Sequence, residues 1–128
     1  MTDYQQLLPR EGLIADCRND APARGLVDAK SLREAAADLV REGYLMHYGQ
    51  ARYYTLADPD LALLAGDRLY AAGLAALSEQ GDIEAVGILA RLIAASAEAH
   101  AASQLDAVSD LWQQSLAMLA PDPTTATQ

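Results

Sequence analysis

Apolar residues recur every three or four positions along most of the chain, and this spacing predicts helices. The first helix is expected to begin at Asp28 or Ser31, either of which can cap it. It should end at Gly43, because glycine often terminates a helix. Its inward stripe consists of Leu32, Ala35 or Ala36, Leu39 and Val40.

The C-terminal part carries stronger boundary signals. Asp58 followed by Pro59 combines a capping side chain with a first-turn proline, which predicts a helix over residues 59–80. Gly81 and Asp82 then end that helix and cap the next one. So short a connection makes the two helices antiparallel neighbours.

Two more helices complete the pattern. One spans residues 83–102, and the other begins at Gln104 or Asp106 and ends at Leu119. The prolines that follow exclude further helix, so residues 121–128 are expected to form a disordered tail.

Residues 44–59 are the one stretch with strand character. Tyrosines are concentrated there, and Tyr48-Gly49-Gln50 can turn a short hairpin. The expected fold is therefore mainly α, an antiparallel helical bundle within one domain, residues 1–128. Residues 1–57 form an irregular N-terminal part with one helix and the hairpin, and residues 58–120 form a three-helix part.

Composition and charge narrow the function classes. The chain has 128 residues and a net charge of −9, of which residues 57–128 carry −8 (ten acids against two arginines). Such a surface repels nucleic acid, which leaves only residues 1–57 as a nucleic-acid contact. A single cysteine, Cys17, together with the lack of a signal sequence or of a continuous apolar span, predicts a cytoplasmic protein without membrane contact.

Two stripes run side by side on the predicted 59–80 helix. One contains Leu63, Asp67, Tyr70, Leu74 and Leu77. The other consists mostly of small residues, which let a neighbouring helix approach closely: Ala62, Gly66, Leu69, Gly73 and Ala76. We expect Gly66, Leu69, Gly73 and Ala76 to form an interface, with Trp112 as either a core residue or an exposed anchor for a partner.

Asp67 lies inside the first stripe, and a buried carboxylate must be paired or hydrogen-bonded. The structural interpretation makes it a partner of a backbone amide or of an arginine such as Arg52 or Arg91, and it joins Asp58, Pro59, Gly81 and Asp82 as a structural residue. The functional interpretation makes it a metal or substrate ligand. A metal site requires Asp67, Glu98 and His100 to converge.

Residues 61–102 resemble the middle of a trans-isoprenyl (polyprenyl) diphosphate synthase. The Leu-Ala-Gly-Asp run at residues 64–67, the break at Gly81-Asp82 and the alanine-rich helix ending near Glu98 carry the resemblance. The catalytic members hold magnesium with DDxxD-type motifs, whereas no two acids are adjacent in this chain. The resemblance therefore implies a short, non-catalytic subunit that pairs with a catalytic chain.

Residues 39–64 resemble instead the end of a winged-helix repressor of the ArsR/SmtB type. Arg52, Tyr53 and Tyr54 match its wing, and Asp58-Pro59 matches the start of its dimerisation helix. The recognition helix would be SLREAAADLVRE, which places alanines where polar, base-reading side chains are needed.

The leading hypothesis is thus a non-catalytic helical subunit or interaction module without a cofactor, which packs on a protein partner or on a second copy. The alternative is a winged-helix transcriptional regulator with a helical dimerisation tail. An enzyme is less favoured, because the sequence contains no nucleophile or acid–base signature.

Overall fold

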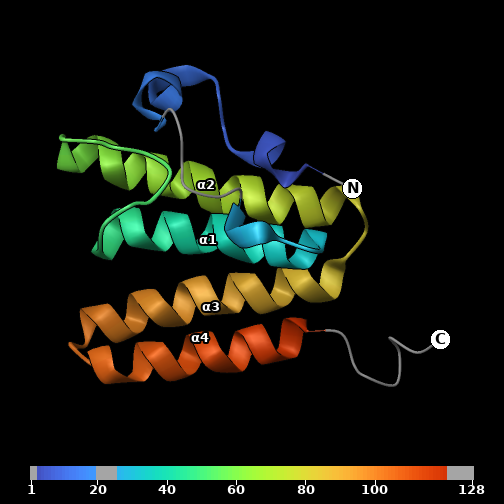
Figure 1. The fold of residues 1–128 in the computed structure, drawn as a ribbon. Coiled ribbons are helices and arrows are strands. Elements are labelled where there is room, and N and C mark those ends of the chain that lie inside the picture. The colour runs from blue at the N-terminus through green and yellow to red at the C-terminus, as the bar shows by residue number, and fades with distance from the viewer. Residues whose placement is uncertain (1–2, 20–25, 121–128) are drawn as a thin grey trace.

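The computed structural model describes residues 3–19 and 26–120. Four α-helices account for most of it: α1 (Leu32–Tyr48), α2 (Pro59–Glu79), α3 (Ile83–Ala101) and α4 (Leu105–Leu119). Before α1 come three short 3₁₀ helices, η1 (Tyr4–Leu7), η2 (Gly12–Cys17) and η3 (Leu26–Asp28). Successive α-helices run in opposite directions (Figure 1), which confirms the predicted antiparallel, mainly α fold. The predicted tail, 121–128, lies outside the described residues.

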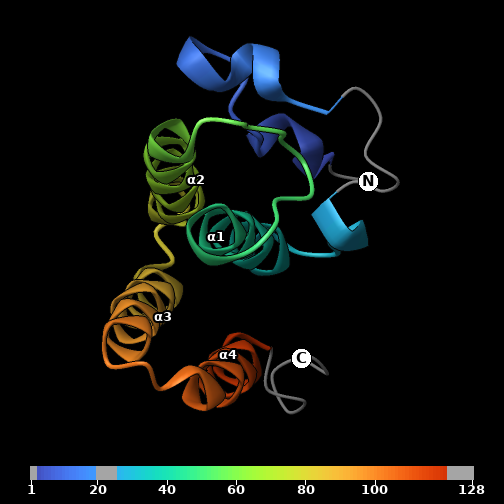
Figure 2. The same cartoon turned by 90° about the vertical axis from the view of Figure 1, so that its left-hand side faces the viewer.

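The four helices form two hairpins. Seen end-on, α1 and α2 lie side by side beneath the N-terminal segment, and α3 and α4 lie on the other side of this pair (Figure 2). One apolar cluster joins α1 to α3 and α4 through residues such as Val40, Leu89 and Trp112. A second joins the N-terminal segment to α1 and α2 through Leu8, Leu39 and Leu69.

Side-chain caps from neighbouring residues stabilise the starts of the helices. Ser31 accepts a hydrogen bond from the Glu34 amide at 3.1 Å, so it is Ser31 and not Asp28 that caps α1. Asp58 accepts from the amide of Asp60 at the start of α2, with Pro59 in the first turn. Because these contacts are made within a few residues, the sequence pattern was sufficient to predict them.

The turn between α2 and α3 is equally local. Gly81 has φ +75°, a conformation that glycine adopts without the steric cost other residues meet. The Asp82 carboxylate then accepts from the amide of Ala85 at 3.2 Å and caps α3. The connection from α2 to α3 thus consists of Gln80, Gly81 and Asp82, and it includes both residues that the sequence pattern indicated.

The prediction that α1 ends at Gly43 was wrong. The helix continues to Tyr48, and Gly49 is its C-terminal cap. A Cβ atom on Gly43 would lie 2.6 Å from the carbonyl oxygen of Gly66, so this glycine allows α1 and α2 to touch through their backbones. It serves a close helix contact and not a helix end.

The predicted hairpin is also absent from the described residues. Residues 44–48 are helical, and residues 49–58 run back along α1 in an irregular path whose one sheet-like contact is an isolated bridge between Arg18 and Tyr54. The wing that the ArsR-type resemblance implied is therefore not formed by residues 44–58.

Candidate functional site

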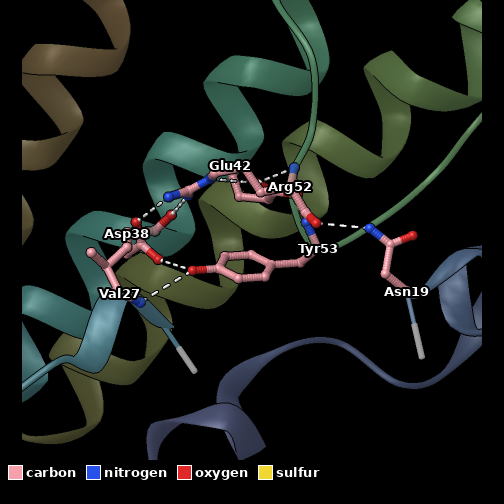
Figure 3. Close-up of polar contacts among 6 residues, drawn as sticks. All are labelled: Asn19, Val27, Asp38, Glu42, Arg52 and Tyr53. Atoms are coloured by element: carbon pink, nitrogen blue, oxygen red, sulfur yellow. Dashed lines mark hydrogen bonds and ion pairs between the residues drawn. The ribbon is translucent and has the colours of Figure 1, made fainter. Parts of the chain in front are cut away.

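A network of buried charges lies between α1 and the segment that follows it. Glu42 is fully buried and Asp38 is 7% exposed. Both face Arg52, whose Nη1 donates to Asp38 Oδ1 at 2.8 Å and whose Nε donates to Glu42 Oε1 at 3.1 Å (Figure 3). A helical turn separates the two acids, which therefore lie on the same side of α1.

Backbone amides and a tyrosine satisfy the remaining carboxylate oxygens. Glu42 accepts from the amides of Arg52 and Tyr53, the latter at 2.6 Å, and Asp38 accepts from the Tyr53 hydroxyl at 2.5 Å. The same hydroxyl accepts from the Val27 amide at 3.2 Å, and the Arg52 carbonyl accepts from Asn19 at 2.7 Å (Figure 3). The network thus holds the N-terminal segment on α1.

The titration behaviour of this network matches a structural role. Burial and the hydrogen bond to Asp38 raise the pKa of Tyr53 well above its ordinary range. Burial opposes the charge on Arg52, but the acids around it outweigh this effect and raise its pKa. The tyrosine therefore stays neutral and the guanidinium charged, and the two acids are committed to internal partners.

A second group gathers six aromatic rings contributed by all four α-helices. Tyr48 stacks on His100 with centroids 3.7 Å apart, and Tyr44 donates to or accepts from His100 Nε2 at 2.8 Å. Trp112 lies edge-on to Tyr44 at 5.5 Å, and His47 lies 5.2 Å from Tyr70. We call this the ring cluster; it contains both histidines of the chain and consists of Tyr44, His47, Tyr48, Tyr70, His100 and Trp112.

Asp67 does not occupy the buried position that the stripe predicted. Its side chain is 67% exposed, and its partner is His47, with Nε2 3.2 Å from Oδ1. The neighbouring small-residue stripe is the buried one, because the contact between Gly43 and Gly66 brings α1 onto that face of α2. Leu63, one turn before Asp67, is exposed as well.

The residues expected to contact a partner are instead buried, fully or in part, by contacts within the chain. Gly66, Leu69 and Gly73 are buried against α1, and a Cβ atom on Gly73 would lie 2.9 Å from the carbonyl oxygen of Ala36. Trp112 is 7% exposed and belongs to the core. Ala76 is half-buried in the same stripe. An interface with another chain must therefore use other surfaces.

The structure does not bring Asp67, Glu98 and His100 together. Asp67 pairs with His47 of α1, His100 packs on Tyr44 and Tyr48, and Glu98 is exposed. Within residues 3–19 and 26–120, no group of three His, Cys, Asp or Glu side chains is placed to hold a metal ion.

α2 is the one helix among the described residues that is long and apolar enough to cross a membrane by length and composition. Core helices of other proteins meet the same criterion, and the buried residues of α2 include Leu69 and Leu77.

Comparison of the chain with protein-family models, with curated proteins and with solved structures finds no match. The functional argument therefore depends on the surfaces and contacts of the chain itself.

Proposed function

We propose that this protein is a non-catalytic helical interaction module, which packs the outer faces of α3 and α4 onto a second copy or a partner chain in the cytoplasm. The apolar side chains that these faces leave exposed carry the proposal. On α3, four alanines at successive steps of four, three and four residues are all exposed: Ala90, Ala94, Ala97 and Ala101. A surface of this kind is typical of helix–helix contact.

Larger apolar groups are also exposed on these two helices. Ile83 at the start of α3 is 67% exposed, and on α4 Leu105, Leu116 and Met118 are 58%, 42% and 55% exposed. Single exposed apolar residues are ordinary, but several on two adjacent helices mark an interaction surface. Beside the alanines, Glu84, Arg91 and Glu98 recur every seven residues and supply a charged rim.

Two observations support the non-catalytic part of the proposal. The most buried acids, Asp38 and Glu42, are already bonded to Arg52 and Tyr53. The resemblance to trans-isoprenyl diphosphate synthases falls on residues 61–102, which cover most of α2 and all of α3, and that family includes short subunits that pair with a catalytic chain. The proposed partner is accordingly such a chain or a second copy of this one.

Light scattering at high micromolar concentration tests the proposal. The natural protein is expected as a dimer or larger species, whereas Ala94→Glu with Ala97→Glu should give a monomer, because two carboxylates would be buried in the contact. Ala57→Glu, at an exposed position in the segment before α2, is the matched control and should leave the mass unchanged. A second arm mixes the protein with a catalytic trans-isoprenyl diphosphate synthase chain. A monomer that also fails to bind that chain would contradict the proposal.

A further inference from the structure

Two cavities lie end to end between the N-terminal segment and α2. The first, of 490 Å³, is bounded by residues 6–11 and by Ala71, Ala72 and Ala75 of α2. The second, of 380 Å³, is bounded by Glu11, Gly12 and Ile14 and by residues of the first turns of α2, including Leu61 and Leu64. Glu11 and Arg68 line both, so the two cavities form one groove, which we call the Arg68 groove.

The floor of the Arg68 groove is apolar and long. On α2 it extends from Leu61 to Ala75, which corresponds to roughly 21 Å at 1.5 Å per residue. Alanines at 71, 72 and 75 keep the first cavity open, because larger side chains there would fill it. The volumes of both cavities are in the range of small-molecule sites, and such sites are mostly apolar with few polar groups.

Arg68 stands at the middle of this floor. Within the described residues its guanidinium makes no hydrogen bond or ion pair, unlike Arg33 and Arg52. Arg10 lines the first cavity as a second cation, and Glu11 is the one acid of the lining. In a protein of net charge −9, two cations against one acid make the groove locally positive.

We propose that the Arg68 groove binds a free fatty acid, with its carboxylate on Arg68 and its single acyl chain folded into the first cavity over Ala71, Ala72 and Ala75. A guanidinium pairs with a carboxylate through two parallel hydrogen bonds, and an acyl chain gains by leaving water. The groove lies under the N-terminal segment, and α3 and α4 lie on the other side of the α1–α2 pair (Figure 2), so this site does not depend on the proposed protein contact.

Calorimetric titration of the full chain with myristate, below the concentration at which it forms micelles, tests the proposal. One saturable site is expected, and decanoate, laurate and myristate should bind about two- to fourfold more tightly per added methylene. Arg68→Gln should weaken binding about tenfold, and Ala75→Leu should weaken it by filling the first cavity. Lys30→Gln, which removes an exposed cation before α1, is the matched control and should bind as the natural protein does.

Three results would overturn the proposal. The first is the absence of saturable myristate binding by the natural protein. The second is binding that Arg68→Gln and Ala75→Leu leave unchanged while their circular dichroism and melting match the natural protein. The third is binding to phosphatidylglycerol vesicles without binding to free myristate, which would assign the groove to a membrane surface. Because the chain-length series uses the natural protein, a variant that fails to fold does not prevent the test.

Discussion

The two helical hairpins of this protein are built differently. The α1–α2 hairpin is held by backbone contact at Gly43 and Gly66 and by a charge network in which the buried carboxylates are fully bonded. In the α3–α4 hairpin, the buried Ser96 hydroxyl and the Trp112 indole N–H lack a hydrogen-bond partner among the described residues. Its outer faces also expose alanines, leucines and a methionine.

The two hairpins therefore differ in how far the chain itself covers their apolar faces. The first hairpin lies between the N-terminal segment and the α3–α4 hairpin (Figure 2), and on α2 it leaves Leu63 and Leu64 exposed. The second hairpin has one covered face and one that is open. In a monomer, an open face of small and apolar side chains costs free energy because it is exposed to water. A second chain that covers this face removes that cost.

Breaking the charge network should have the largest effect. Arg52→Met leaves Asp38 and Glu42 buried without a countercharge, and we expect a loss of about 3–5 kcal/mol in the free energy of unfolding, measured with urea. Lys30→Met, which removes an exposed cation before α1, should change the free energy by less than about 0.5 kcal/mol. Equal effects of the two substitutions would contradict the role of the network.

Separating α1 from α2 should cause the second-largest loss in the free energy of unfolding. Gly43→Ala places a methyl group against the Gly66 backbone, and the free energy of unfolding should fall by about 1–3 kcal/mol. Gly87→Ala is the control on α3, where the added methyl would meet only the end of the Arg91 side chain at 3.3 Å. That substitution should stabilise by about 0.5–1 kcal/mol, because alanine favours helix. If Gly43→Ala were also stabilising, the close contact would be disproved.

One ion pair joins the two hairpins at the start of α3. Its contribution to the free energy of unfolding should be smaller than those of the charge network and of the contact between α1 and α2. Arg33 of α1 donates to both carboxylate oxygens of Asp82, at 2.6 and 2.8 Å, and to the carbonyl oxygen of Leu119 at 3.3 Å. Because the pair is partly exposed, a double-mutant cycle of Arg33→Gln and Asp82→Asn should give a coupling of about 0.5–1 kcal/mol. Asparagine retains the capping oxygen, so the cycle isolates the pair. Additive free energies would show that the hairpins are held by apolar packing alone.

The smallest expected change in stability at neutral pH comes from Tyr54, which lies under the N-terminal segment. Burial raises the pKa of Tyr54 from 10 to about 12, and its hydroxyl donates to the Pro9 carbonyl at 2.8 Å. The unfolded chain loses this proton near pH 10 while the folded chain keeps it, so stability is fully present below pH 10 and falls between pH 10 and about 12.

Tyr54→Phe should therefore reduce the steepness of alkaline unfolding in that window, followed by circular dichroism. Tyr53 and Tyr70 also have raised pKa values through burial, so the variant should retain part of the effect. An unchanged alkaline transition would contradict the assignment to Tyr54.

The sequence predicted the features that depend on neighbouring residues. The starts of α2 and α3 follow from Asp58-Pro59 and Gly81-Asp82, because caps and turns are made within a few positions. The end of α1 was missed, since a glycine at a helix contact and a glycine at a helix end look alike in sequence. Only the position of α2 distinguishes them.

The site residues were harder to predict for a related reason. Both stripes on α2 carried apolar side chains, and the position of α1 decided that Gly66, Leu69 and Gly73 are buried while Asp67 is exposed. The Arg52 network was missed, although Asp38 and Glu42 gave a signal as two acids one turn apart on the side of α1 that carries Ala35 and Leu39. Their common partner lies in the irregular segment after α1, whose path has no sequence periodicity.

Hydrogen exchange at two protein concentrations tests most directly the claim that the second hairpin is completed by another chain. We expect the amides of α3 and α4 to exchange more slowly at high micromolar than at low micromolar concentration, while those of α1 and α2 exchange equally in both, because only the second hairpin gains a partner. Exchange in α3 and α4 that is independent of concentration, both alone and with a catalytic synthase chain added, would contradict the claim.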